Sequence, residues 1–337
     1  MRAARRILVI GLSNVGDGVL MSPVIARLSR AFPQARLTLL VGERARALFL
    51  DDPRVHELMG LDAFRGWSGR ARLVGLLWRF RPGLLIDLRH TALPLVWKPW
   101  RAWRYFWPLP KQMPMRQRHL LRLCRQAGMR LDGSDTGSPS LWISPDDQRH
   151  ITTLTSRWKL PTSQPVVVLC PGARNHTKRW YTDRFAAVAD RLIEEAGAEV
   201  VFTGEPDESE TIRDVMAGMR HRAHNAVGCT TIRQLAALMQ QAQLVITNDS
   251  ASLHVADAVG TPVLALFGPT DPRKYGPTGG RGRVIQRRLF CVPCEQSLCR
   301  YAHECMRFIH ADEVYRAAHQ ILGGEGWKVK GGGGIEQ

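Results

Sequence analysis

The chain has 337 residues, 45% of them hydrophobic, and its 47 Lys and Arg residues exceed its 30 Asp and Glu residues to give a formal net charge of +17. This length and hydrophobic content suit two folded domains and exclude a largely disordered chain. The basic excess favours nucleic acid, anionic lipid or a phosphorylated substrate as a partner, although a merely Arg-rich protein would show the same excess.

The first part of the chain alternates short apolar runs with helical patterns. The apolar run near the N-terminus is too short for a signal peptide, and no run in the sequence reaches the length of a transmembrane helix, so we expect a cytoplasmic protein. The segment Val19–Phe32 has helical spacing and is followed by Pro33. Three runs are typical of strands buried on both faces of a parallel sheet: Ile7–Ile10, Leu37–Val41 and Leu84–Leu88.

Basic residues and tryptophans are mixed between Arg65 and Arg125, where Asp87 is the single acid. The mixture suits a bilayer interface, where indole rings lie at headgroup level and cations meet lipid phosphates. It also suits single-stranded nucleic acid, and some tryptophans, Trp78 in particular, would instead belong to a protein core. We expect segment 65–125 to contact the anionic inner-membrane surface, and we expect no nucleic acid partner.

The second part repeats the alternation of strand and helix. Its apolar runs are separated by helical patterns at Thr182–Ala196, Thr231–Gln241 and Ser252–Val259, and Gly197 is a C-cap candidate. This order predicts parallel βαβ units. The predicted strands are Val166–Cys170, Glu199–Thr203, Leu244–Thr247 and Val263–Phe267.

A turn-rich stretch and the proline pair Pro161 and Pro165 mark the break between the two parts. We predict an α/β protein with two doubly wound, Rossmann-like parallel-sheet domains, at 1–160 and 161–325, followed by a flexible tail at 326–337. In such folds ligands bind at the carboxyl ends of the strands, so we expect the two domains to face each other across a ligand-binding cleft.

The first predicted strand runs into Gly11–Gly18, a glycine-rich turn before a helix. It is not a P-loop, because Asp17 stands where the lysine would be, and it is not a dinucleotide fingerprint, because Met21 stands where the last glycine would be. Asp17 is either a helix-capping residue or a general base.

Three further turns follow predicted strands of the second domain. Pro171–Trp180 combines glycine, small polar residues and cations before a helix, which indicates an anion site with Lys178 as the phosphate contact. In Thr247–His254, Ser250 or Ser252 would cap a helix whose N–H groups face a diphosphate, and His254 is either a ligand contact or a packed histidine. Glu205 would accept hydrogen bonds from ribose hydroxyls.

These turns together resemble glycosyltransferase family nine, the heptosyltransferases of lipopolysaccharide core assembly. The resemblance covers nearly the whole chain and is most specific at the block Leu266–Pro272. It implies the two-domain GT-B fold, an acceptor-binding N-terminal domain, a C-terminal domain that binds the nucleotide sugar, and a last helix near 311–322 that packs back on the N-terminal domain. The family's usual glycine after the Asp-Ser pair is Ala251 here, and its extra methyl group near the diphosphate would alter the fit of the donor.

The resemblance also implies roles for individual residues. Asp17 matches the family's catalytic carboxylate, in an acceptor-side loop with Ser13, Asn14, Gly16 and Gly18. The donor would bind to Gly172, Thr177, Lys178, Glu205, Asp249, Ser250, Ser252 and His254.

Four thiols at short spacings, Cys291, Cys294, Cys299 and Cys305, form a candidate structural zinc site. Apart from that ion we expect no cofactor, since no Asp-x-Asp pair requires a metal to bridge the diphosphate. The alternative is that the thiols bind no metal, because their spacing is looser than that of paired C-x-x-C units.

We therefore expect an inverting glycosyltransferase that moves a sugar, as ADP-heptose, onto a lipid-linked acceptor of the lipopolysaccharide core type, peripherally associated with the inner membrane. Two alternatives stay open. One is a glycosyltransferase for another surface glycan with a different nucleotide sugar. The other is a non-catalytic protein that binds nucleotides or nucleic acid.

Overall fold

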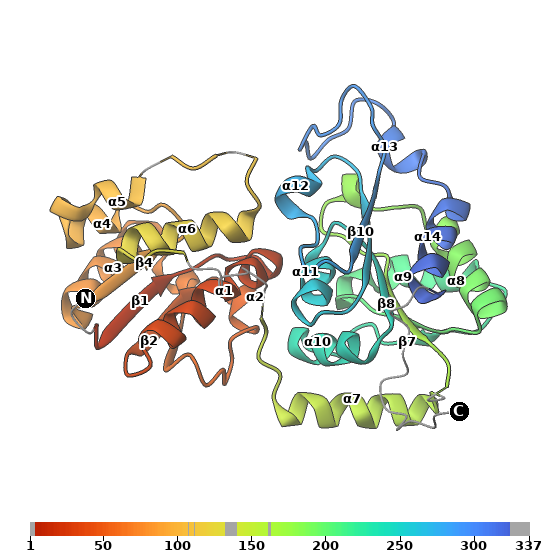
Figure 1. The fold of residues 1–337 in the computed structure, drawn as a ribbon, viewed down its shortest axis with the longest axis horizontal. Helices are drawn as coiled ribbons and strands as arrows, with labels where there is room; N and C mark the ends of the chain where they lie inside the picture. The colour runs from red at the N-terminus through yellow and green to blue at the C-terminus, as the bar shows by residue number, and fades with distance from the viewer. Residues whose placement is uncertain (1–3, 107, 111, 132–139, 161–162, 324–337) are drawn as a thin grey trace. The chain divides into compact units, whose positions relative to one another are not determined.

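The computed structural model describes residues 4–106, 108–110, 112–131, 140–160 and 163–323. The chain divides into two compact units, residues 1–144 and 145–337, each built around its own parallel sheet (Figure 1). The domain boundary predicted near residue 160 lies at the end of helix α7 (Pro145–Trp158), which groups with the second unit. The predicted tail at 326–337 lies outside the described residues.

A four-stranded sheet of order β3-β2-β1-β4 forms the first unit, and all of its strands are parallel. Side chains from β1, β2 and β4 meet helix α3 on one face of the sheet, with Leu73 and Leu77 of α3 buried there. The strands are β1 (Arg6–Ile10), β2 (Arg36–Val41), β3 (Glu57–Gly60) and β4 (Leu84–Asp87).

The helices of the first unit follow the strands in βα order. Helix α6 packs against both α1 and β4, so it covers the end of the sheet where β4 lies. The helices are α1 (Val15–Ala31), α2 (Glu43–Arg46), α3 (Gly66–Phe80), α4 (Leu93–Trp97), α5 (Trp103–Phe106) and α6 (Met115–Ala127), with 3-10 turns η1 (Leu61–Phe64) and η2 (Pro99–Arg101).

The second unit has a six-stranded parallel sheet of order β10-β9-β8-β5-β6-β7. The chain order reverses at β5, so the ends of β5 and β8 lie at a topological switch point, where α/β proteins bind ligands. The strands are β5 (Val166–Cys170), β6 (Glu199–Phe202), β7 (His224–Asn225), β8 (Leu244–Asn248), β9 (Val263–Phe267) and β10 (Gly282–Gln286).

Helices cover this second sheet, and its central strands β8 and β9 are buried along their whole length. The elements are α7, α8 (Thr182–Ala196), α9 (Ser209–Ala217), α10 (Ile232–Gln241), α11 (Ala251–Ala258), α12 (Pro272–Tyr275), α13 (Glu304–Arg307) and α14 (Ala311–Gly323), with 3-10 turns η3 (His176–Lys178) and η4 (Pro206–Glu208). No helix in the described part of the chain is both long and apolar enough to cross a membrane.

The seven strands predicted from apolar runs are confirmed to within about one residue at each end. The edge strands β3, β7 and β10 were not predicted. All three have exposed or half-buried residues, and β7 spans two residues, so none carries the apolar run that marks a buried strand. Gly197 has the left-handed backbone of a helix C-cap, as predicted.

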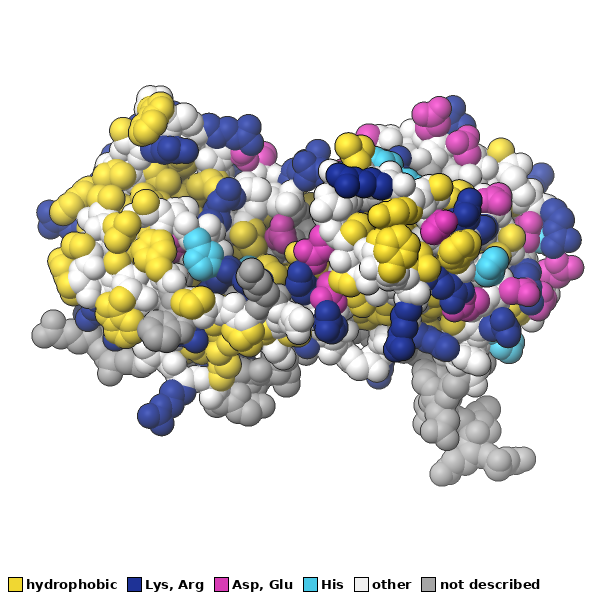
Figure 2. All heavy atoms as spheres, turned by 90° about the horizontal axis from the view of Figure 1, so that it is seen from above, with side chains coloured by type: hydrophobic (Ala, Val, Ile, Leu, Met, Phe, Trp, Pro, Cys, Tyr) yellow, Lys and Arg dark blue, Asp and Glu magenta, His cyan; other side chains and the backbone are white. Residues whose placement is uncertain are grey.

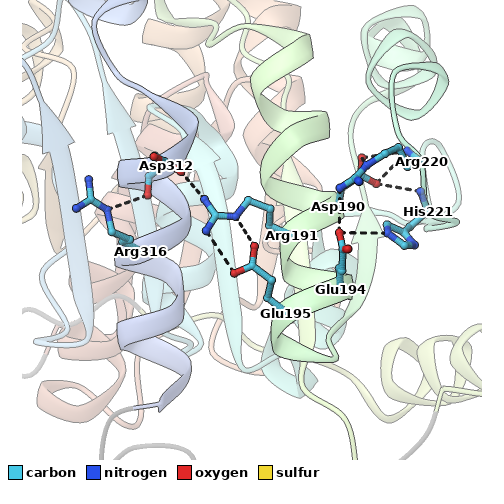
Figure 3. Close-up of polar contacts among 8 residues, drawn as sticks. All are labelled: Asp190, Arg191, Glu194, Glu195, Arg220, His221, Asp312 and Arg316. Atoms are coloured by element: carbon cyan, nitrogen blue, oxygen red, sulfur yellow. Dashed lines mark hydrogen bonds and ion pairs between the residues drawn. The ribbon is translucent and has the colours of Figure 1, made fainter.

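The last helix, α14, groups with the second unit, and its packing back on the N-terminal domain stays a prediction. Its apolar face, with Val314 and Ala318 fully buried, belongs to the hydrophobic core of the second sheet. Arg191 of α8 adds polar links, because its guanidinium donates to Asp312 at 2.5 Å and to Glu195 at 2.6 Å (Figure 3). Ion pairs with exposed partners add little stability, so the buried face fixes the position of α14.

Candidate functional site

Asp17 lies in the first turn of α1, which begins at Val15 and not at the predicted Val19. Its carboxylate is half-buried, and Asn14 Nδ2 donates to Asp17 Oδ2 at 3.0 Å. A carboxylate in the first turn of a helix is stabilised by the helix dipole. Asp17 is therefore held at the carboxyl end of β1 in an orientation set by Asn14, while Asn14 and not Asp17 occupies the N-cap position.

Two of the predicted loop glycines belong to this helix. Gly16 and Gly18 lie within α1, and a Cβ on Gly18 would stand 2.7 Å from Leu48 Cδ1. Gly18 is thus buried by packing against α2 and its neighbours, and it does not present a surface to a ligand. Ser13 and Asn14 remain in the loop before α1, as predicted.

Arg89 was not among the predicted site residues, although it directly follows the predicted strand at Leu84–Leu88. Its Nη1 donates to Ser13 Oγ at 2.6 Å, which brings an exposed cation to the loop that carries Asp17. Asp87 fixes the turn before it by accepting hydrogen bonds from the backbone of Arg89 and Thr91. Burial raises the pKa of Asp87. We therefore assign this buried carboxylate to holding the turn and not to contact with a ligand.

In the second unit, Lys178 and Asp249 meet across the ends of β5 and β8. Lys178 Nζ stands 2.7 Å from Asp249 Oδ2, and Thr270 Oγ1 donates to the same oxygen. Lys178 is 26% exposed, whereas the Asp249 side chain is 5% exposed. The carboxylate therefore orients the ammonium group, and Lys178 keeps the solvent-facing side from which an anion can approach.

Asn248 ties the turn after β5 to the end of β8. Its Nδ2 donates to Pro171 O at 2.6 Å, and the backbone N–H of Trp180 donates to its Oδ1 at 3.1 Å. Thr177, which is buried, donates from Oγ1 to Gln296 O, so it holds the turn and offers little surface to a ligand. Asn248 and Thr270 were not predicted, because a sequence does not show which polar side chains brace a turn.

The start of helix α11 differs from the prediction in its cap. Ser250 occupies the N-cap position, but its side chain makes no capping hydrogen bond within the described structure; its Oγ lies 3.2 Å from Thr247 Oγ1. Ser252 bonds the buried thiol of Cys170. Neither serine caps the helix, so neither hydroxyl covers the N–H groups of its first turn, which suit an anion. His254 is buried in this helix.

Glu205 is exposed and caps the turn η4, where it forms a capping box with Glu208. Glu208 Oε2 accepts from the backbone N–H of Glu205 at 3.0 Å. Glu208 is half-buried, and burial raises its pKa. A Cβ on Gly172 would stand 2.0 Å from the Glu208 carboxyl group, so the predicted site residue Gly172 makes room for Glu208. Glu208, which was not predicted, is the acid next to this turn.

The four cysteines of the candidate zinc site line one cavity of about 250 Å³, together with Thr177 and His303. Backbone N–H groups of Tyr301 and His303 donate to Cys299 Sγ, and burial, with the neighbouring Cys299, raises the pKa of Cys305 to about 11. Within the described ranges no group of three or more His, Cys, Asp or Glu side chains is placed to hold a metal ion. Zinc binding here stays a prediction.

Known proteins match this chain along most of its length. The lipopolysaccharide heptosyltransferase 2 of Escherichia coli K12 is 26% identical over 326 residues, covering 83% of this chain and 88% of that protein. The lipooligosaccharide heptosyltransferase 2 of Haemophilus ducreyi is 27% identical over 346 residues, covering 94% and 99%.

Solved structures share the fold. A family 9 glycosyl transferase from Veillonella parvula matches with a TM-score of 0.81 and 23% identity over 94% of this chain and 97% of its own. The E. coli ADP-heptose LPS heptosyltransferase II matches with a TM-score of 0.73 and 23% identity over 94% and 98%. These likenesses confirm the predicted GT-B fold with two parallel sheets.

The family model described as "Glycosyltransferase family 9 (heptosyltransferase)" matches residues 101–304, more than half of the chain, and includes Lys178, Glu208 and Asp249. With the sites at the strand ends and the agreement in fold, this match establishes that the chain is a glycosyltransferase and belongs to glycosyltransferase family 9.

Proposed function

We propose that this protein transfers heptose from ADP-heptose to an acceptor of the lipopolysaccharide core type, with inversion at the anomeric carbon. The observation that carries the proposal is the Lys178–Asp249 pair beside the start of α11 at the switch point of the second sheet. A fixed cation and a helix N-terminus suit a diphosphate. The relatives are named for heptosyl transfer to lipopolysaccharide or lipooligosaccharide, and they match along most of their length.

The donor binds to the second unit in this proposal. Lys178 contacts the diphosphate, and the uncapped first turn of α11 donates N–H groups to it. Asp249 acts through Lys178, because a carboxylate facing the diphosphate itself would repel it. Glu208 replaces Glu205 as the acceptor of ribose hydroxyl hydrogen bonds, since Glu205 accepts a backbone hydrogen bond within η4 and Glu208 lies beside Gly172.

Asp17 is the general base. The acceptor hydroxyl loses its proton to the Asp17 carboxylate as its oxygen bonds to the anomeric carbon. The bond from that carbon to the diphosphate oxygen breaks, and its electron pair leaves with the nucleoside diphosphate, where Lys178 stabilises the new charge. A single displacement of this kind inverts the configuration of the sugar.

A donor panel tests the function. The full-length protein is given an acceptor extracted from bacteria whose lipopolysaccharide core stops before its heptoses, and the donors are ADP-heptose, UDP-glucose and GDP-mannose. We expect product mass to rise by one heptose with ADP-heptose alone. The panel varies the donor because Ala251 adds a methyl group at the first residue of α11, beside the proposed position of the diphosphate.

The other outcomes separate the alternatives. A mass increase with UDP-glucose or GDP-mannose alone would assign a different surface glycan. No product from any donor, together with RNA binding that falls steeply with salt, would support the nucleic-acid-binding alternative. The control is Arg184→Gln, a cation of the same unit whose Nη1 donates to the backbone carbonyl oxygens of Arg307 and Ile309, and which should keep the donor preference.

We further propose that the first unit attaches to the anionic inner face of the membrane. Trp67, Trp100 and Trp103 are 85%, 71% and 63% exposed. Arg70 and Arg104 lie over the rings of Trp67 and Trp103. Trp78 is 55% exposed, so its assignment to a core was wrong, and Trp107 lies outside the described residues. Figure 2 shows mainly hydrophobic and basic side chains on this unit, with acidic ones concentrated on the second.

Liposome flotation tests the membrane proposal. We expect the wild-type protein to float with vesicles that contain phosphatidylglycerol and to stay behind with pure phosphatidylcholine, because indoles and cations together favour an anionic interface. The triple variant Trp67→Ser, Trp100→Ser, Trp103→Ser should lose most of the binding. Phe290→Ser removes a ring that is 82% exposed on the second unit and should change nothing. Equal flotation with both vesicles would contradict the proposal.

A further inference from the structure

A second group of basic side chains lies at the carboxyl end of β4, where α6 packs against that strand. It consists of His90, just after β4, and of Arg118, His119 and Arg122 on α6. Asp87 is the single acid of segment 65–125, and its carboxylate already accepts hydrogen bonds from the turn at Arg89 and Thr91. We call His90, Arg118, His119 and Arg122 the α6 cluster.

The members of the α6 cluster lie close enough to repel one another. Burial, and then the charges of Arg122 and Arg118, lower the pKa of His119 to about 3. Burial and Arg122 also lower the pKa of His90, and burial and Arg118 lower the pKa of Arg122. The fold therefore gathers four basic side chains, and among the described residues the two charged members, Arg118 and Arg122, form no ion pair.

The hydrogen bonds of the cluster are also incomplete. His119 is fully buried, and neither of its ring nitrogens has a hydrogen-bond partner among the described residues. Arg122 Nη1 donates to Leu88 O and Arg118 Nη1 to Met115 Sδ, but the Nε atoms of both are buried without a partner in the described chain. Buried polar groups are ordinarily satisfied, and leaving a donor unpaired costs about 1–3 kcal/mol.

We propose that the α6 cluster is a subsite for an anionic group, a phosphate or a carboxylate, on the sugar acceptor. An oxyanion held by Arg118 and Arg122, with His90 at its side, supplies the missing acceptors and the missing negative charge. His119 underlies these residues as a positioning group whose neutral ring offers one donor and one acceptor. This inference rests on the proposed function, since it assigns the acceptor to this unit.

The position of the cluster agrees with an acceptor better than with the donor. Arg89, the neighbour of His90, donates to Ser13 in the loop before α1, and that helix carries Asp17 in its first turn. An anionic group bound at the α6 cluster thus lies on the same unit and beside the same loop as the proposed base. The proposed contacts of the donor diphosphate are on the second unit.

Calorimetry and NMR on the full chain test the subsite, with inorganic phosphate as the probe, malonate as the carboxylate probe and NaCl at matched ionic strength as the blank. We expect phosphate or malonate to bind and to shift the ring resonances of His90, because a nearby anion favours its protonated form. The resonances of the neutral His119 ring should shift because the anion changes its surroundings. Tighter binding of phosphate would identify a phosphate on the acceptor, and tighter binding of malonate a sugar carboxylate.

Variants of α6 complete the test. The double variant Arg118→Gln, Arg122→Gln should weaken anion binding at least about tenfold, as the loss of one charge-assisted hydrogen bond already predicts. Arg122→Lys keeps the charge but loses the planar fork, and it covers the case in which the double variant fails to fold. The matched control is Arg125→Gln, on the same helix, whose Nη1 donates to Pro108 O.

The two proposals fail in different ways. Binding of phosphate and malonate that is absent, or unchanged in the cluster variants, overturns the subsite even if the wild-type protein transfers heptose. Anion binding that depends on Arg118 and Arg122 in a protein that transfers no sugar overturns the proposed function and leaves an anion site. If both hold, the cluster variants raise the KM for the acceptor and leave ADP affinity unchanged.

Discussion

We expect Asp17→Asn to lower the rate of sugar transfer by about 10²- to 10⁴-fold, the usual contribution of a positioned general base. Asparagine keeps the size of the side chain and can still bond Asn14, whose Nδ2 donates to Asp17 Oδ2 at 3.0 Å. It does not accept a proton. The loss should therefore appear in kcat, while the affinity for ADP stays within about twofold, since the proposed donor contacts lie on the second unit.

Three measurements support that experiment. Transfer is followed by product mass, ADP affinity by calorimetry, and folding by thermal melting. The matched control is Asp51→Asn, an exposed aspartate of the same unit with a left-handed backbone that asparagine tolerates, and its activity should equal that of the wild type. If Asp17→Asn keeps the wild-type kcat, Asp17 is not the general base. A large loss of ADP affinity would instead indicate that Asp17 contacts the donor.

The sequence predicted the sheets well because their central strands are buried on both faces. Val263–Phe267, for example, is a continuous apolar run bounded by Pro262 and Gly268, and it is β9 without change. The edge strand β7 has no such run, since it consists of His224 and Asn225 and is held by pairing with β6. Pairing of this kind depends on a neighbour that the local sequence does not show.

At the candidate site the turns could be predicted from the sequence, but the directions of the side chains could not. Lys178 and Asp249 are far apart in the chain, and each was placed at a strand end, but their ion pair follows from the adjacency of β5 and β8. Glu205 was predicted because it follows a predicted strand directly, in the turn after Thr203. The capping box turns Glu205 toward its own backbone and places Glu208 beside Gly172.

The α6 cluster is a second case in which the sequence does not show which side chains become buried. The sequence shows many cations and one acid between Arg65 and Arg125, which predicts a basic surface. It does not show that Arg118, His119 and Arg122 are drawn into the fold by the packing of α6 on β4, whereas Trp67 and Trp100 stay in solvent. Burial thus separates the exposed tryptophans, which we propose contact lipid, from the half-buried arginines, which we propose bind an anion.

Breaking the Lys178–Asp249 ion pair should weaken both ADP binding and the stability of the fold. We expect Lys178→Met to weaken ADP binding by about 10- to 100-fold, which corresponds to the loss of one hydrogen bond from a charged donor. The same change should lower the free energy of unfolding by about 3 kcal/mol. This value lies at the low end for a broken buried pair, because Lys178 is 26% exposed while Asp249 is left buried without its cation.

A double-mutant cycle separates the two effects. Asp249→Asn alone should weaken ADP binding by less than about tenfold, because the exposed ammonium of Lys178 stays hydrated and free to meet the diphosphate. The double variant Lys178→Met, Asp249→Asn removes the uncompensated carboxylate, and the new amide can still accept from Thr270 Oγ1. We therefore expect it to recover most of the lost stability and none of the lost ADP affinity.

Chemical denaturation and calorimetry on the four proteins of the cycle measure both quantities. Arg184→Met is the matched control, since Arg184 donates to the backbone carbonyl oxygens of Arg307 and Ile309 and lies over the ring of Tyr181. It should leave ADP affinity unchanged. Recovery of ADP affinity along with stability in the double variant would show that Lys178 only neutralises Asp249, and the diphosphate contact would then belong to the start of α11 alone.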